Sequence, residues 1–203
     1  MPNQVQPAYT RQKVLVGQAR VFLQKIVTGS VPALPADTVA LGGAWPSAGA
    51  NIWVPPGATS EGLNFRFQRS TQDINVEEQL TPVAVNTTGL DISMEMVLSE
   101  DSMETMAVAY GSGSIVTVAA GSGIMGKKTL TIGSDLDNFA FGFETQNEFG
   151  FFRRVLIPSV VSVGQAETLY RRAQDARRYA VSFRVLCAPE EIIVIDKTAN
   201  ALP

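Results

Sequence analysis

A glycine-rich segment at residues 121–128, Gly-Ser-Gly-Ile-Met-Gly-Lys-Lys, has the spacing of a phosphate-binding loop. It contains G-x-G-x-x-G and comes within one residue of G-x-x-x-x-G-K-S/T. Such a loop binds phosphate when a helix follows it and a hydroxyl side chain holds Mg²⁺. Here Lys128 takes the hydroxyl position, and the next residues alternate as in a strand. The segment is therefore predicted to be a hairpin turn.

A second candidate site is the acidic stretch that begins at Asp73. Asp73, Asn75 and Glu77 are spaced like the first ligands of a calcium-binding loop. The glycine at the sixth position and the glutamate at the twelfth are both missing. Ile74 and Val76 alternate with the polar residues, which is typical of a strand with one solvated face. No calcium site is predicted here.

Two further acidic groups have the residue types of an acid and base pair. Asp135 lies close to Asp137, and Glu100 and Asp101 lie close to Glu104. Paired carboxylates of this kind carry out glycoside hydrolysis in other proteins. A polar turn accounts for the first group, and the start of a helix, where the dipole favours anions, accounts for the second.

Composition narrows the chemistry further. The chain has 203 residues, no histidine and one cysteine. This excludes Ser-His-Asp triads, Cys-His pairs, histidine zinc sites and an internal disulfide. Cys187 continues an alternating apolar row and is predicted to be a buried small residue. We expect a protein without catalytic residues, metal or cofactor, and therefore not an enzyme.

Charge is unevenly distributed along the chain. The net charge of -3 has the wrong sign for a protein that holds nucleic acid by neutralising phosphates. Residues 61–148 carry thirteen acidic residues against four Lys and Arg, whereas residues 149–184 carry two against seven. This pattern indicates complementary surfaces, within one molecule or between copies of it. Four arginines of the basic segment are predicted to make contacts between subunits, with nucleic-acid contact as the alternative: Arg171, Arg172, Arg177 and Arg178.

Alternation with a period of two dominates the rest of the chain. In residues 87–98, for example, Ile92, Met94 and Met96 share one face and polar residues share the other. Glycine-containing turns separate many such segments, so a mainly β fold in a single domain of residues 1–203 is predicted. Strands are expected at residues 13–16, 19–26, 61–70, 71–80, 87–98, 114–119, 128–132, 138–144, 151–157, 160–163, 179–187 and 192–195.

One short helix is predicted over residues 99–110. Ser99 has the residue type of an N-cap, acidic residues follow it, and apolar residues then recur at helical spacing. Gly111 has the residue type that ends a helix in the left-handed conformation. The pattern at residues 166–178 fits either a helix or a wide hairpin.

Residues 28–60 differ from the rest of the chain, with five Gly, five Pro, seven Ala and a single charged residue. The segment is nevertheless apolar and contains Trp45 and Trp53. Long loops in compact domains are usually functional or become ordered on a neighbour. We expect an extended arm whose two tryptophans contact another copy. Deletion of residues 30–55 should then leave a folded monomer that no longer polymerises.

Several segments, in their order along the chain, resemble the major tail tube proteins of long-tailed bacteriophages. The likeness covers most of residues 12–187 and consists of structural patterns, not catalytic signatures. It is carried by the glycine-rich arm with its two tryptophans, G-A-T-S-E-G before a strand at 57–62, D-I-N-V-E-E-Q at 73–79, the alternating strand and helix at 87–111, and R-R-Y-A-V-S-F at 177–183.

The resemblance implies a β-sandwich or barrel-like tail tube fold, with one short α-helix flanking the sheets and long loops or arms. It implies hexameric rings that stack into a hollow tube around a tape measure protein. Further partners would be the tail tip or baseplate and the tail terminator, with no membrane. The protein would be found in the virion, and in the host cytoplasm during assembly. Viral DNA would pass through the tube without being tightly bound.

Within such a tube, the acidic segment would suit the wall of the channel, because carboxylates repel phosphate. The residues expected to line the channel are Asp73, Glu77, Asp91 and Glu95. Two other protein classes stay open at this point. One is another β-sandwich module of the virion, such as a capsid decoration or attachment protein, and the other is the tube protein of a contractile or secretion machine.

Overall fold

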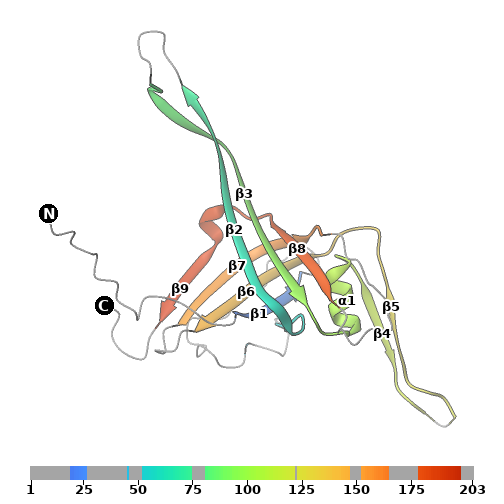
Figure 1. Cartoon of the computed structure of the whole chain (residues 1–203). Helices are drawn as coiled ribbons and strands as arrows, with labels where there is room; N and C mark the ends of the chain where they lie inside the picture. Colours follow the sequence, from blue (N-terminus) through green and yellow to red (C-terminus); the bar gives the residue numbers. More distant parts are fainter. Residues whose placement is uncertain are drawn as a thin grey trace.

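The computed structural model describes residues 19–26, 45, 52–74, 81–121, 123–146, 152–164 and 178–197. Most of them lie in strands, and there is one short α-helix, so the predicted mainly β fold is confirmed (Figure 1). The elements are β1 (Ala19–Lys25), β2 (Thr59–Ile74), β3 (Ala84–Leu98), α1 (Met103–Ala109), β4 (Ser114–Val118), β5 (Lys127–Thr131), β6 (Asn138–Gln146), β7 (Phe152–Ser162), β8 (Tyr179–Val185), the 3-10 turn η2 (Pro189–Glu191) and β9 (Ile193–Lys197).

The main sheet has the strand order β1-β6-β7-β8-β3-β2, with antiparallel neighbours throughout, and β9 also pairs with β7. One edge of β7 pairs with β6. On its other edge, residues 152–156 pair with β9 and residues 160–162 pair with β8. The two strands β9 and β8 therefore follow one another along a single edge of β7.

Pro158 explains how β7 serves two partners. The sequence predicted two strands, at 151–157 and 160–163, but the structure has one strand that runs through the proline. Proline cannot donate a hydrogen bond to a ladder and is tolerated at bulges. The register between β6 and β7 shifts at this point, since Phe139 pairs with Val160 and Phe141 with Ile157. Pro158 thus lies in a bulge at the place where the partner strand changes.

A single main core lies between the two halves of this sheet. Alternate residues of β1, β6 and β7 pack against alternate residues of β3 and β8. Figure 1 shows β2, β3 and β8 crossing in front of β1, β6 and β7. The fully buried side chains of this main core include Met94, Leu98, Phe141, Ile157, Tyr179 and Phe183.

The opposite face of β1, β6 and β7 is also covered. Phe22, Ala140 and Leu156 point to this side and form a second cluster with Trp45 and Trp53. Val54, which follows Trp53 in the chain, forms an isolated β-bridge with Leu23 of β1. Their backbone groups exchange hydrogen bonds of 2.9 and 2.8 Å. β6 is consequently buried on both faces along most of its length.

Helix α1 is shorter than the sequence predicted. Its N-cap is Ser102, whose Oγ accepts a hydrogen bond from the Thr105 N–H at 3.1 Å. The prediction of Ser99 as the cap is wrong, because the Ser99 N–H donates to the Ala58 carbonyl at 2.8 Å and continues the pairing of β2 with β3. The predicted left-handed end at Gly111 is confirmed by its φ of 74°.

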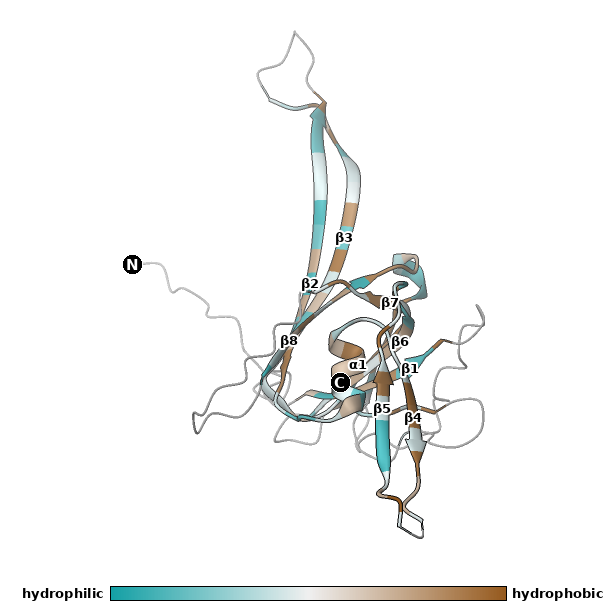
Figure 2. Ribbon diagram, turned by 90° about the vertical axis from the view of Figure 1, so that its right-hand side faces the viewer, coloured by the Kyte–Doolittle hydropathy of each residue, from teal (hydrophilic) through white to brown (hydrophobic). Residues whose placement is uncertain are grey.

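Two β-hairpins extend away from the core in roughly opposite directions (Figures 1 and 2). One is formed by β2 and β3. The sequence predicted two strands at 61–70 and 71–80, whereas the structure has the single 16-residue strand β2, which spans the first segment and the beginning of the second. The other is formed by β4 and β5, and its tip closes through two 3.0 Å backbone hydrogen bonds between Gly121 and Ile124. The predicted hairpin turn at 121–128 is therefore confirmed. The predicted strand at 13–16 lies outside the described residues, as does almost all of the ambiguous segment 166–178.

Candidate functional site

The β2–β3 hairpin extends well past the strand that supports it. β8 pairs with β3 only from Ser93 to Leu98. From Ala84 to Ile92, β3 pairs with β2 alone, and within the described part of the chain no strand pairs with the outer edge of β2. Open strand edges are templates for pairing with another chain. We call residues 64–74 and 84–92 the projecting ribbon; from Phe67 and Ile92 outward it extends beyond β8, and residues 64–66 form its base.

One face of this hairpin is polar and carries charges of both signs. The register aligns Asn64, Glu95 and Ser182 in one row across β2, β3 and β8. It aligns Arg66, Ser93 and Arg184 in the next row.

The arginine of the second row, Arg184, also reaches an acid on the same face. Its Nε lies 3.2 Å from Asp91 Oδ1, with both side chains more than half exposed. The residues around Glu95 line a groove of about 310 Å³. This polar face is therefore balanced in charge and not strongly acidic.

The structure brings together two of the four acids expected to line a channel. Asp91 and Glu95 lie on the polar face of β3, as alternation predicted. Asp73 falls on the opposite face, because alternation along the continuous β2 groups it with Phe65 and Phe67. Asp73 therefore does not lie beside Asp91 and Glu95, and that it lines a channel together with them stays a prediction. Glu77 lies outside the described residues.

The other face of the projecting ribbon carries exposed apolar side chains, with Arg69 and Asp73 of β2 among them; Arg69 pairs with Leu90, and its guanidinium carbon lies 5.4 Å from the centre of the Phe67 ring. Phe65 and Phe67 of β2 lie there beside Leu90 of β3, followed by Val85 towards the tip. All four are exposed, although they continue the row of buried side chains of the main core. Phe65 still contacts the core, with its ring centroid 6.1 Å from that of Phe143. We call these four residues the apolar stripe. Alternation in the sequence did not show that this row of apolar residues extends beyond the main core.

Trp45 and Trp53 are used inside the subunit. Their side chains are only 4% and 2% exposed. Trp45 stacks on Phe22 with centroids 4.4 Å apart and meets Trp53 edge-on at 5.0 Å. A Cβ on Gly142 would approach the Trp45 ring to 2.3 Å, so this glycine makes room for the indole. These rings have little surface left for a neighbouring subunit.

The buried tryptophans change one expectation. A deletion of residues 30–55 removes both rings from the second cluster and uncovers Phe22 and Leu156. We therefore no longer expect that deletion to leave a folded monomer. The contribution of other residues of the arm to contacts between subunits stays a prediction.

A buried ion pair lies beneath Trp45 and was not foreseen from the sequence. Glu144 of β6 and Arg154 of β7 are direct cross-strand partners and almost completely buried. Arg154 Nε and Nη2 lie 2.8 and 2.5 Å from Glu144 Oε1, and the guanidinium carbon lies 5.3 Å from the Trp45 ring. Arg20 Nη1 lies 3.8 Å from the other carboxylate oxygen, Glu144 Oε2. The sequence held one signal of this burial, because Glu144 directly follows the apolar run at residues 139–143.

Exposed ion pairs shift the pKa values of their members. Arg153 donates from Nε and Nη2 to the two Asp196 carboxylate oxygens at 2.6 and 2.7 Å, joining β7 to β9. This hydrogen bonding lowers the pKa of Asp196 and raises that of Arg153. Lys128 Nζ donates to Glu104 Oε1 at 2.8 Å and lowers the pKa of that carboxyl.

Cys187 was predicted to be a buried small residue. It packs against the main core but is only partly buried. Burial is the main reason why the pKa of its thiol is raised. A thiol with a raised pKa is a poor nucleophile at neutral pH.

The structure describes one of the four arginines that were predicted to make contacts between subunits. Arg178 is exposed at the start of β8, whereas Arg171, Arg172 and Arg177 lie outside the described residues.

Among the described residues, no three His, Cys, Asp or Glu side chains gather closely enough to hold a metal ion. No helix of the described chain is long and apolar enough to cross a membrane. No protein-family model matches this sequence, and no curated protein matches it.

Proposed function

We propose that this chain is a structural subunit that assembles with copies of itself into hexameric rings, which stack into the hollow tail tube of a long-tailed bacteriophage. The observation that carries the proposal is the projecting ribbon, with its unpaired edges, its polar face and its apolar stripe. A soluble protein that leaves such a ribbon uncovered risks uncontrolled pairing. A ring in which each ribbon is covered by the next subunit removes that risk.

The two faces of the ribbon suit the two surfaces of a tube wall. The apolar stripe would be buried against a neighbouring subunit, where removal from water stabilises the ring. The polar face would then line the channel. Its two acids, Asp91 and Glu95, balance its two arginines, Arg66 and Arg184, so the face offers passing DNA no net positive charge, and the ion pair with Asp91 neutralises Arg184 locally. DNA would therefore slide along this face without being held.

The resemblance of the sequence to major tail tube proteins supports the same proposal, and the projecting ribbon contains the beginnings of two of the segments that carry it, at 73–79 and 87–111. In the tail tube fold, two packed β layers flanked by a helix form the wall, and no catalytic residues are required. The tape measure protein, the tail tip and the tail terminator would be the partners of the finished tube. The tube protein of a contractile or secretion machine would assemble in the same manner.

Electron microscopy of the purified full-length chain tests this function. We expect hollow rods in negative stain, with six-fold end views. A matched variant replaces residues 71–88 by Asn-Gly, which closes a two-residue hairpin between the paired residues Ser70 and Gly89. It shortens the ribbon and leaves the β3–β8 pairing intact.

This variant should unfold as cooperatively as the parent protein but form no rods. Particles of one small size for the parent chain at every concentration would overturn the proposal and favour a decoration or attachment protein.

A further inference from the structure

The tip of the β4–β5 hairpin presents apolar side chains to solvent. Ile124 is 66% exposed and Met125 87% exposed, far from the main core (Figure 2). The hairpin from Ser114 to Thr131 contains no acidic residue and two lysines, Lys127 and Lys128. Lys128 pairs with Glu104, whereas Lys127 has no ion-pair partner among the described residues. The tip is thus apolar with a positive charge beside it.

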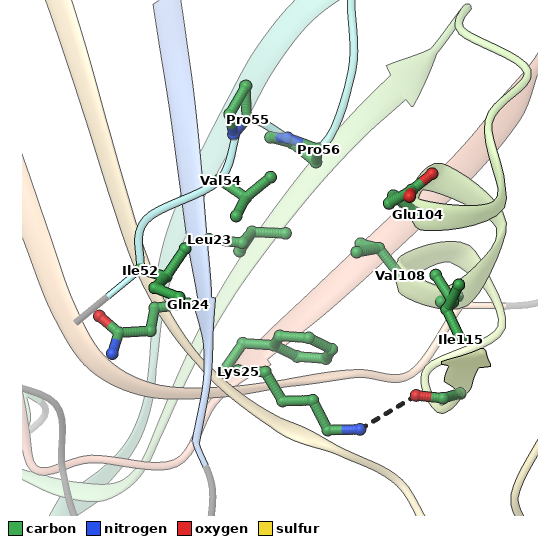
Figure 3. A pocket seen from close by; sticks show the side chains of 13 residues that line it. Leu23, Gln24, Lys25, Ile52, Val54, Pro55, Pro56, Glu104, Val108 and Ile115 are labelled. Atoms are coloured by element: carbon green, nitrogen blue, oxygen red, sulfur yellow. Dashed lines mark hydrogen bonds between the residues drawn. The ribbon is translucent and has the colours of Figure 1, made fainter. Parts of the chain in front are cut away.

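An apolar pocket of about 420 Å³ opens at the base of the same hairpin (Figure 3). β1, residues 52–56, α1 and the start of β4 form its walls. The apolar side chains that line it include Leu23, Val54, Pro55, Val108, Ile115 and Phe139. Two of its lining residues, Ile52 and Val54, are themselves well exposed. The described part of the chain places no side chain that fills this pocket.

Of the charged side chains around the pocket, the one without an ion-pair partner among the described residues is a carboxylate. Lys25 lies in the wall, but its Nζ donates to Asp137 Oδ2 at 2.6 Å and to the Gly113 carbonyl at 3.1 Å. Glu104 is part of the lining, but its carboxylate accepts a hydrogen bond from Lys128. Glu100 does not line the pocket but lies next to its Pro56 wall, since a Cβ added to Gly57 would come within 3.3 Å of the Glu100 Oε2, and it has no ion-pair partner among the described residues. The rim therefore complements the charge of Lys127.

The tip of a hairpin cannot reach the pocket of its own chain. Ile115 lines the pocket, and Gly121 at the tip is six residues further along β4. A strand rises roughly 3.3 Å per residue, which separates the two by about 20 Å. Any chain that uses both surfaces must use them with different copies.

We propose that Ile124 and Met125 of one copy dock in this pocket of a second copy, with Lys127 facing Glu100. Because the donating and accepting surfaces differ, the contact is heterologous and repeats from copy to copy. This inference rests on the proposed function and adds to it the partner of this hairpin, which is the pocket of a neighbouring subunit.

Disulfide trapping between copies tests the contact directly. In a Cys187→Ala background, Met125→Cys is combined with Val54→Cys in the pocket, and the full-length protein is oxidised mildly with diamide. A non-reducing gel should show a ladder of dimers, trimers and larger species that disappears on reduction. The matched control combines Met125→Cys with Val194→Cys, a somewhat more exposed position than Val54, on β9 and away from the pocket. It should remain mostly monomeric.

Absence of the ladder, or an equal ladder from the control pair, would overturn the docking proposal. Micrographs of the same samples keep the two proposals apart. Rods without a specific ladder would reject the docking contact and leave the tube function standing. A specific ladder without rods would support the contact and reject the tube.

Discussion

Strands β6 and β3 both place large apolar residues at alternate positions, yet the two strands are buried differently. β6 is covered on both faces, by the main core on one side and by the two tryptophans on the other. β3 is buried only along its last residues, and its first half extends from the core with both faces exposed. The chain thus places its apolar side chains inside the subunit in one region and displays them in the other.

This difference separates residues that stabilise the fold from residues that are free for assembly. Substitutions around β6 should lower the free energy of unfolding, because there the side chains have no alternative to close packing. Substitutions on the projecting ribbon should leave that free energy nearly unchanged and alter the association of subunits. The predictions below test each side of this contrast.

The largest effect is expected at the buried ion pair. Arg154→Met leaves the Glu144 carboxylate buried without its closest partner and should lower the free energy of unfolding by about 3–5 kcal/mol. The double variant Glu144→Leu/Arg154→Met removes both charges and should recover most of the loss. Urea unfolding measures both.

The neighbouring Arg153→Met is the control, since its pair with Asp196 is exposed and should contribute only about 0–1 kcal/mol. Equal losses at the two arginines would show that burial of the pair is not what matters.

The next effect concerns the close approach of Trp45 to β6. Gly142→Ala places a Cβ within 2.3 Å of the indole and should cost about 1–3 kcal/mol, because the ring must move. The same change in a Trp45→Ala background should cost much less, which a double-mutant cycle would show.

Gly89→Ala in β3 serves as the control for this change. A Cβ there meets Ser70 at an ordinary 3.7 Å. A Gly142→Ala cost that is unaffected by loss of the indole would contradict this account.

Much of the fold could be predicted because it depends on local patterns. Alternation located most of the strands, and the helix and the glycine hairpin followed from residue types that favour caps and turns. The main errors came from tertiary pairing. Ser99 has the chemistry of an N-cap but remains in the β2–β3 ladder, and Pro158 ends no strand because a bulge accommodates it.

The candidate site was less accessible for a similar reason. Alternation assigns a residue to a face, but it does not tell where the opposing layer ends. Phe65 and Phe67 alternate with polar residues just as the buried residues of β3 do, but they lie on an exposed stripe. Asp73 was grouped with Asp91 before the register between β2 and β3 was known. The pairing of Glu144 with Arg154 depends on that kind of register as well.

A smaller effect on stability, but a clear one on assembly, is expected from the apolar stripe. Phe67→Thr/Leu90→Thr should change the free energy of unfolding by no more than about 0.5 kcal/mol, because both side chains are already exposed. It should nevertheless abolish rods in negative stain, since the neighbouring subunit would lose its apolar contact. Gln68→Thr, on the polar face next to Phe67, is the control and should assemble normally. Rods of normal length from the double variant would mean that the stripe is not covered in the assembly.

The smallest expected effect is a pH dependence at the junction of β7 and β9. The hydrogen bonds from Arg153 lower the pKa of Asp196 below its usual value near 3.9. A lowered carboxyl pKa adds stability that is fully present above the unfolded pKa and is lost as the pH falls through the folded one. Asp196→Asn should therefore be slightly less stable than the parent protein at pH 6, by less than about 1 kcal/mol because the pair is exposed. The gap should close below about pH 4 and shrink in 1 M salt, where screening weakens exposed pairs. A gap that stays constant as the pH falls well below about 4 and that 1 M salt does not reduce would assign the stabilisation to packing of the Asp196 side chain and not to its charge.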